Sequence, residues 1–127
     1  MTESKRALSD YIYQSKYSLY REDLGRKEVW EESVERIYQM HLTHLGIHAP
    51  AALQDEWFME QLHEAIDYYK QKKFVGSPRN LQVGGEPVLK SSANSYNCSY
   101  SHCDRLEVCR ETEWRLLSGC GCGLSVE

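Results

Sequence analysis

Residues 116–126 read Leu-Leu-Ser-Gly-Cys-Gly-Cys-Gly-Leu-Ser-Val, and this stretch decides how the second half of the chain is interpreted. Glycine has no Cβ, so the alternating glycines let the backbone approach a ligand closely and expose its amides. The spacing fits neither a Walker phosphate loop, which needs Gly-Lys-Ser/Thr, nor the dinucleotide fingerprint GxGxxG. A tight turn between a helix and a strand explains the same glycines equally well.

The residues on either side of this loop predict a mixture of strands and one helix. A helix is expected over Arg105–Leu117 and a short strand over Leu124–Val126, with the glycine loop between them. Tyr96, Cys98 and Tyr100 show the alternation of a strand. Further upstream, Leu81–Val83 is predicted as a short strand, and Val88-Leu89 as the beginning of another.

The first half of the chain is predicted to be helical. A first helix is expected from Ser9 to Tyr20, a second over Lys27–Leu45 with Gly46 as its stop, and a third over Ala52–Lys73. The second has one apolar face at helical spacing, formed by Trp30, Val34, Ile37, Tyr38, His41 and Leu45. The fold class is therefore α+β, with a helical region over residues 1–75 and a strand-bearing region over 76–127.

Composition limits the kinds of partner. The chain has 127 residues, 41% of them hydrophobic, and a formal net charge of −4. This balance is typical of soluble globular proteins and favours neither nucleic acid nor an anionic membrane as a partner. No signal peptide or membrane-length apolar run is present, so a cytoplasmic location is the default expectation.

All five cysteines follow residue 97, at Cys98, Cys103, Cys109, Cys120 and Cys122. The odd number and the missing secretory signal argue against a disulfide scaffold and favour metal or redox chemistry. The gaps of four, five, ten and one residue contain no C-x-x-C pair, so they fit a zinc site poorly. A small zinc-binding or protein-interaction module with a cysteine-rich tail remains the alternative interpretation. Cys109 is expected to be a buried small hydrophobic residue.

His41, His44 and His48 are the other candidate metal ligands, because a helix would place them on neighbouring turns of one face. A metal site would need a further ligand and a second shell, and Gly46 is predicted to end the helix first, so we expect the three histidines to face solvent, with His41 partly packed. No metal site is therefore predicted.

Three motifs, taken in order, resemble a known family. Gly-Ser-Pro-Arg-Asn-Leu at 76–81, Asn97-Cys98 and the 116–126 stretch resemble the start of the catalytic barrel in ribonucleotide reductases. Tyr13, Lys16-Tyr17-Ser18 and residues 30–36 resemble the helical N-terminal region of those enzymes. The chain is most similar to the N-terminal portion of the large subunit in the adenosylcobalamin-dependent class II ribonucleoside-triphosphate reductases. The resemblance implies the first strands and a helix of an incomplete ten-stranded α/β barrel.

The resemblance also implies a site. Cys98 matches the first of two thiols that reduce the ribose and end as a disulfide. Ser77 and Asn97 match residues that line the substrate site, and Gly121 matches the point where the backbone packs against the ribonucleotide. Pro78 stands where related enzymes often have glycine, which weakens the match at Ser77.

The same family places its radical-carrying cysteine, the second reducing thiol, the shuttle cysteines and the cobalamin contacts later in the polypeptide. The isolated chain is therefore predicted to be inactive. The expected partners are the remainder of the reductase, a ribonucleotide, adenosylcobalamin and a thioredoxin-type reductant in the complete enzyme. A remnant without activity is a third interpretation.

Overall fold

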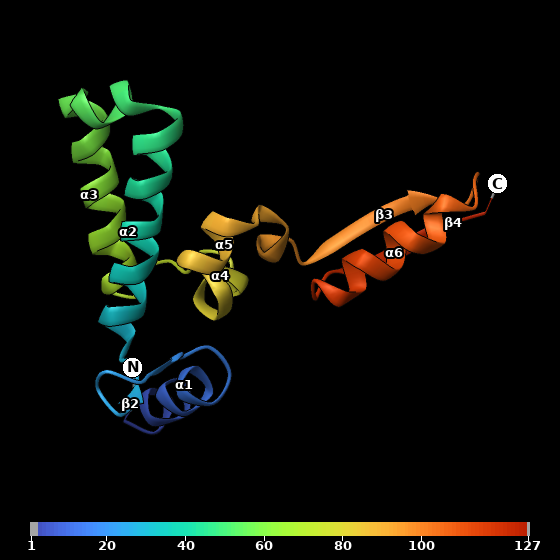
Figure 1. The fold of residues 1–127 in the computed structure, drawn as a ribbon. Coiled ribbons are helices and arrows are strands. Elements are labelled where there is room, and N and C mark those ends of the chain that lie inside the picture. The colour runs from blue at the N-terminus through green and yellow to red at the C-terminus, as the bar shows by residue number, and fades with distance from the viewer. Residues whose placement is uncertain (1–2, 127) are drawn as a thin grey trace. The chain divides into compact units, whose positions relative to one another are not determined.

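The computed structural model describes residues 3–126, and the chain separates at Gly85 into two compact units (Figure 1). The protein is a mostly helical α+β structure, and each sheet among the described residues has two strands. The predicted α+β class is thus confirmed, whereas residues 3–126 form no barrel. The domain boundary after residue 75 stays a prediction.

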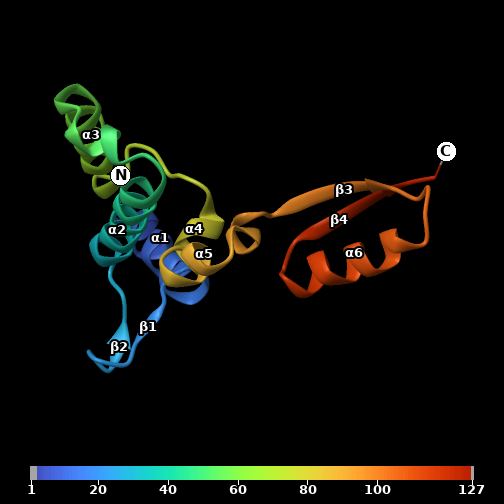
Figure 2. The ribbon, with the colours of Figure 1, turned by 45° about the horizontal axis from the view of Figure 1, so that its top comes forward.

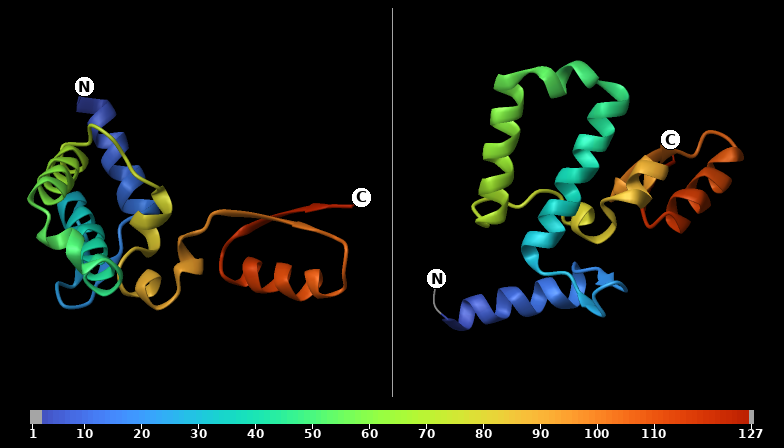
Figure 3. Two further views of the ribbon diagram at one scale, coloured as in Figure 1. Left: turned by 90° about the horizontal axis from the view of Figure 1, so that it is seen from above. Right: turned by 60° about the vertical axis from the view of Figure 1, so that its left-hand side comes forward.

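The N-terminal unit is built around a helical hairpin. Helix α2 (Trp30–His48) and helix α3 (Glu56–Lys70) run side by side, as both panels of Figure 3 show. The predicted apolar face of α2 is confirmed at Trp30, Val34 and Ile37, which are all buried. Farther along the hairpin, the Tyr38 hydroxyl lies 2.7 Å from Nε2 of His63 on α3.

The predicted ends of these two helices are partly wrong. Helix α2 continues through Gly46 to His48, and the Ala49 amide still donates to the Leu45 carbonyl at 2.8 Å. Pro50 then ends the helix, because a proline disfavours helical backbone at the preceding residue. Residues Pro50–Gln54 form a short 3₁₀ helix, η1. Asp55 accepts the Phe58 amide at 3.0 Å and caps α3, whose start is thereby fixed.

Helix α1 (Glu3–Lys16) ends earlier than the predicted Tyr20, because the chain turns into a hairpin. The amides of Tyr17 and Ser18 both donate to the Tyr13 carbonyl, which closes the last turn. The antiparallel strands β1 (Tyr20–Arg21) and β2 (Arg26–Lys27) follow (Figure 2). Gly25, at a φ of +63°, supplies the left-handed backbone that the connecting turn requires.

A buried carboxylate joins three elements of this unit. Glu28 has no exposed surface, and its carboxylate accepts hydrogen bonds from the Ser33 hydroxyl at 2.6 Å and from Nε of Arg36 at 2.9 Å. Arg36 also donates to the Leu81 carbonyl at 2.8 Å. The hydroxyls of Tyr13 and Ser33 lie 2.6 Å apart. Burying the hydroxyl raises the pKa of Tyr13 above its ordinary value. The network ties α1, α2 and the segment after Ser77 together.

The two strands predicted over Leu81–Val83 and Val88-Leu89 are wrong. The first segment belongs to helix α4 (Pro78–Val83) and the second to helix α5 (Glu86–Lys90). Pro78 stands at the beginning of α4, where its fixed φ suits a helix. A short apolar run does not by itself separate a strand from a buried helical turn, and here only Leu81 of the first run is fully buried.

The C-terminal unit begins with α5 and a short 3₁₀ helix, η2 (Ser92–Ser95). Strand β3 (Cys98–His102), helix α6 (Glu107–Leu117) and strand β4 (Gly121–Ser125) follow, with α6 lying against the two strands (Figure 2). The predicted helix and the strand alternation around Cys98 are confirmed. Strand β4 begins inside the glycine stretch, earlier than the predicted Leu124, because Gly121 already pairs with β3.

No helix among residues 3–126 combines the length and the apolar character that crossing a membrane requires.

Candidate functional site

The candidate site lies where two parallel strands begin together. Strands β3 and β4 pair in parallel with Cys98 opposite Gly121, and the Gly121 amide donates to the Asn97 carbonyl at 2.8 Å. Helix α6 makes the crossover between them, so the strands have the βαβ arrangement. Three of the four predicted site residues, Asn97, Cys98 and Gly121, are therefore neighbours, although Gly121 comes more than twenty positions after the other two in the chain.

The two faces of this sheet differ. Residues that point toward α6 include Ser101, whose hydroxyl accepts a hydrogen bond from Arg115, and Cys122, whose thiol lies 3.8 Å from the Thr112 carbonyl oxygen. Successive side chains of a strand point to opposite faces. Cys98 therefore lies on the face away from α6, and its side chain is exposed.

Glycine leaves space beside this thiol. A Cβ added at Gly121 would lie 3.4 Å from the Asn97 carbonyl oxygen, and apart from the two adjoining residues no other atom of residues 3–126 lies within 4 Å of it. The glycine is thus scarcely required by packing within the unit. A ligand on the open face would lie directly against main chain at this position, on the same face of the sheet as the Cys98 side chain.

Tyr100 is a residue of this face that sequence reasoning did not assign to the site. It lies two positions after Cys98, is 59% exposed, and its ring is 5.3 Å from that of His102 in an edge-on arrangement. A Cβ at Gly123 would lie 3.3 Å from Cδ2 of Tyr100, so the second glycine makes room for this ring. The strand alternation of Tyr100 with Cys98 was the available signal.

The remaining cysteines differ in burial. Cys120 is buried and Cys122 half-buried, whereas Cys98, Cys103 and Cys109 are exposed free thiols. The expectation that Cys109 is buried is wrong, because its position on α6 faces away from the sheet, while Val108 on the same helix is buried.

Ser77 belongs to the other unit. It precedes the first residue of α4, and its side chain makes no capping hydrogen bond to that helix. The structure therefore places Ser77 only within the N-terminal unit.

His41, His44 and His48 all lie on α2, since the helix extends to His48. The rings of His44 and His48 are 4.4 Å apart, and partial desolvation, with a contribution from His44, lowers the pKa of His41. Within residues 3–126, no group of three or more His, Cys, Asp and Glu side chains is arranged to hold a metal ion.

Comparisons of the chain with family models, with curated proteins and with solved structures found no match.

Proposed function

We propose that this chain is the N-terminal piece of a ribonucleotide reductase catalytic subunit, most like the adenosylcobalamin-dependent class II enzymes. Cys98 then supplies one of the two thiols that reduce the ribose. The observation that carries the proposal is the register of the parallel strands, which pairs Cys98 with Gly121. A thiol and a side-chain-free stretch of backbone, the two features that the motifs imply, share one face of one sheet.

The sidedness of this sheet supports the same proposal. In α/β barrels, helices cover the outside of the strands and the opposite face looks into the barrel. Helix α6 covers the face of Ser101 and Cys122, so Cys98 and Gly121 would look into the interior of a completed barrel. A reducing thiol that meets a bound nucleotide has to lie on that side.

Exposed apolar side chains indicate that the C-terminal unit is covered in the complete protein. Six of them lie on or next to α6 and β4: Leu106, Trp114, Leu116, Leu117, Leu124 and Val126. A parallel sheet is normally buried on both faces. We propose that the remainder of the reductase polypeptide, in cis or in trans, supplies the missing strands and helices.

The chemistry assigned to this chain is one half of a dithiol reduction. Cys98 and a second thiol from the remainder each lose a proton and an electron and form a disulfide. The ribose loses its 2′-hydroxyl as water, and its 2′-carbon gains hydrogen. A thioredoxin-type reductant then exchanges the disulfide away. We expect adenosylcobalamin to generate the radical on the remainder, and we assign no residue of this chain to its binding.

Reassembly tests the proposal. The chain is mixed with the downstream part of a class II reductase, and deoxynucleotide formation is measured with ribonucleoside triphosphate, adenosylcobalamin and reduced thioredoxin. We expect activity from the mixture and none from the chain alone. Cys98→Ser should abolish multiple turnover while nucleotide binding persists.

Cys109→Ser is the matched control, because that thiol is also exposed and lies in the same unit. It should leave turnover unchanged. Normal multiple turnover by Cys98→Ser, or deoxynucleotide formation by the isolated chain, would overturn the assignment.

The alternative of a small zinc-binding or protein-interaction module draws support only from the exposed thiols and apolar side chains. Elemental analysis separates it from the first proposal. Stoichiometric zinc that survives dialysis, and is lost when the cysteines are alkylated, would favour the module.

A further inference from the structure

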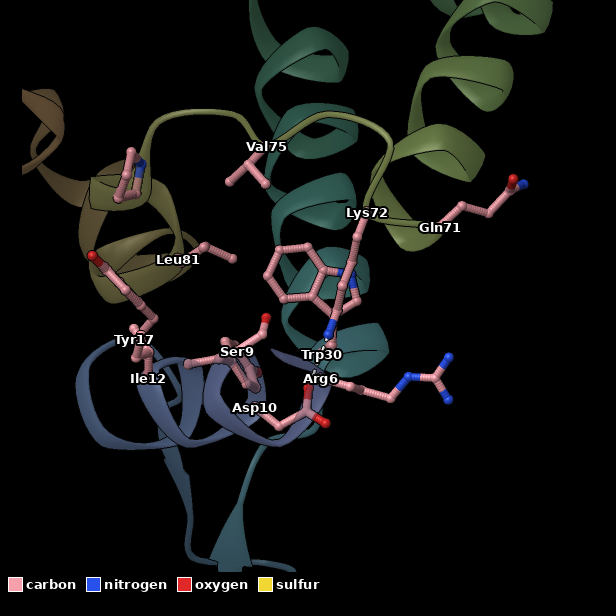
Figure 4. A pocket seen from close by; sticks show the side chains of 12 residues that line it. Arg6, Ser9, Asp10, Ile12, Tyr17, Trp30, Gln71, Lys72, Val75 and Leu81 are labelled. Atoms are coloured by element: carbon pink, nitrogen blue, oxygen red, sulfur yellow. Dashed lines mark hydrogen bonds and ion pairs between the residues drawn. The ribbon is translucent and has the colours of Figure 1, made fainter. Parts of the chain in front are cut away.

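A cavity of about 720 Å³ in the N-terminal unit has no part in the chemistry proposed above (Figure 4). It lies between α1, the start of α2 and the segment that follows α3. Its apolar lining comes from Ile12, Tyr13, Tyr17, Trp30, Val75, Pro78 and Leu81. A volume of this size with a largely apolar lining and a few polar groups is typical of a small-molecule site.

An aromatic ring forms one wall of the cavity. The Trp30 ring packs edge-on against Tyr13 at 5.4 Å and against Tyr69 at 5.5 Å, and its Nε1 donates to the Tyr69 carbonyl at 3.1 Å. These contacts fix the indole in position. A rigid aromatic wall favours a ligand that has a planar ring.

Lys72 crosses the same cavity from an unusual backbone position. Its φ is +57°, and among the described residues no other non-glycine residue has a positive φ. The Lys73 amide donates to the Tyr68 carbonyl, so Lys72 occupies the place after a helix that glycine normally takes. A lysine is strained in this left-handed conformation, whereas glycine is not. Such strain is retained where the side chain makes a contact that stabilises the fold or binds a ligand.

The contacts of that side chain are weak ones. Nζ of Lys72 lies 5.2 Å from the centre of the Trp30 ring and 3.0 Å from a carboxylate oxygen of Asp10 (Figure 4). The two charged side chains are 34% and 54% exposed, and ion pairs of such exposure contribute little to stability. The ammonium group is therefore held at the cavity by contacts that a ligand can replace.

The charge of the lining is opposite in sign to that of the chain. Lys72 and Arg6 are its cations and Asp10 its anion, whereas the whole chain carries −4. The Arg6 side chain makes no hydrogen bond or ion pair within residues 3–126. The cavity thus combines an aromatic wall with two cationic side chains. The Arg6 side chain has no ion-pair partner within the described residues, and Lys72 has only its exposed pair with Asp10.

We propose that this cavity binds a small aromatic anion. Its planar ring takes the place over Trp30 that the Lys72 ammonium now occupies, and its phosphate or carboxylate pairs with Lys72 and Arg6. The site is separate from Cys98 and does not depend on ribonucleotide reduction.

Binding is measured on the chain itself with adenosine monophosphate as the probe. Trp57 and Trp114, which are 69% and 56% exposed, are replaced by phenylalanine so that Trp30 alone reports. We expect a saturable change in fluorescence. Lys72→Gly should weaken binding by about tenfold or more, as the loss of a charge-assisted hydrogen bond does. Glycine suits the positive φ, so this variant keeps the fold.

Lys73→Met is the matched control, because Nζ of Lys73 lies over the Tyr68 ring rather than in the cavity. It should bind the probe as the unaltered chain does. Adenosine should bind more weakly than the monophosphate, and inorganic phosphate should compete poorly. Any one of three results would overturn the proposal. These are no saturable fluorescence change at millimolar adenosine monophosphate, an unchanged affinity in Lys72→Gly, and binding of adenosine as tight as that of the monophosphate.

Discussion

The two units of this chain differ in how many apolar side chains they bury. The N-terminal unit buries three linked aromatic rings and the Glu28 carboxylate, which accepts hydrogen bonds from Ser33 and Arg36 of α2. Among its described residues, the C-terminal unit buries only Val108 and Cys120 as hydrophobic side chains, and it leaves six apolar side chains on or next to α6 and β4 exposed. The first unit thus has a buried core of its own, whereas the second has few buried apolar side chains. This difference fits the proposal that further polypeptide covers the C-terminal unit.

The largest expected effect is on the buried carboxylate. Glu28→Ala removes the partner of Arg36 and leaves a buried cation without a counter-charge. Breaking a buried ion pair in this way costs about 3–5 kcal/mol. Urea unfolding, followed by circular dichroism, measures the loss. Asp23→Asn is the control, because its pair with Arg21 is exposed, and it should leave the unfolding midpoint nearly unchanged. An equally small effect of Glu28→Ala would mean that the N-terminal core does not depend on this network.

Two glycine substitutions sharpen the contrast between the units. A Cβ at Gly84 would lie 2.3 Å from the Asn80 carbonyl oxygen, whereas at Gly121 the nearest atom is 3.4 Å away. Gly84→Ala should therefore destabilise the N-terminal unit by roughly 1–3 kcal/mol, as forced overpacking does. Gly121→Ala should leave the unfolding curve unchanged but reduce turnover in the reassembled enzyme, where the nucleotide needs that space. A folding defect in Gly121→Ala would place the role of this glycine in packing instead.

The smallest expected effect is a pH dependence at the start of α2. Hydrogen bonds from Arg26 and from the Val29 amide lower the pKa of Glu32 to about 2, from an ordinary 4.5. A lowered pKa means that the ionised form stabilises the folded state. This contribution is complete above about pH 4.5 and is lost as the pH falls toward 2. Glu32→Gln should flatten the stability profile of the N-terminal unit in that window, measured by unfolding at several pH values. An unchanged profile would show that this exposed pair has no thermodynamic role.

Much of the helical structure could be predicted from the sequence, because it depends on local periodicity. The apolar spacing at Trp30, Val34 and Ile37 predicts a helix face, and that face is buried. The errors fall where local signals are ambiguous. Gly46 resembles a stop signal but lies inside α2, and the apolar run at Leu81 is equally compatible with a helical turn.

The candidate site could be predicted in part. The order of the motifs predicts Asn97, Cys98 and Gly121 as site residues. Their adjacency depends on a parallel strand pairing that no local signal contains. Tyr100 and the Lys72 cavity were not foreseen. Both depend on which residues distant in the chain meet: Tyr100 with Gly123, and Lys72 with Asp10 and Trp30.

The sequence by itself determined the helical periods, the α+β class and the order of the motifs, since these depend on residues close together in the chain. The tertiary structure alone decided that Glu28 is buried against Arg36, that Cys98 lies opposite Gly121, and which face of the sheet α6 covers. The physical reason is that burial and strand register are set by contacts between distant segments. Such contacts form only when the whole unit has folded.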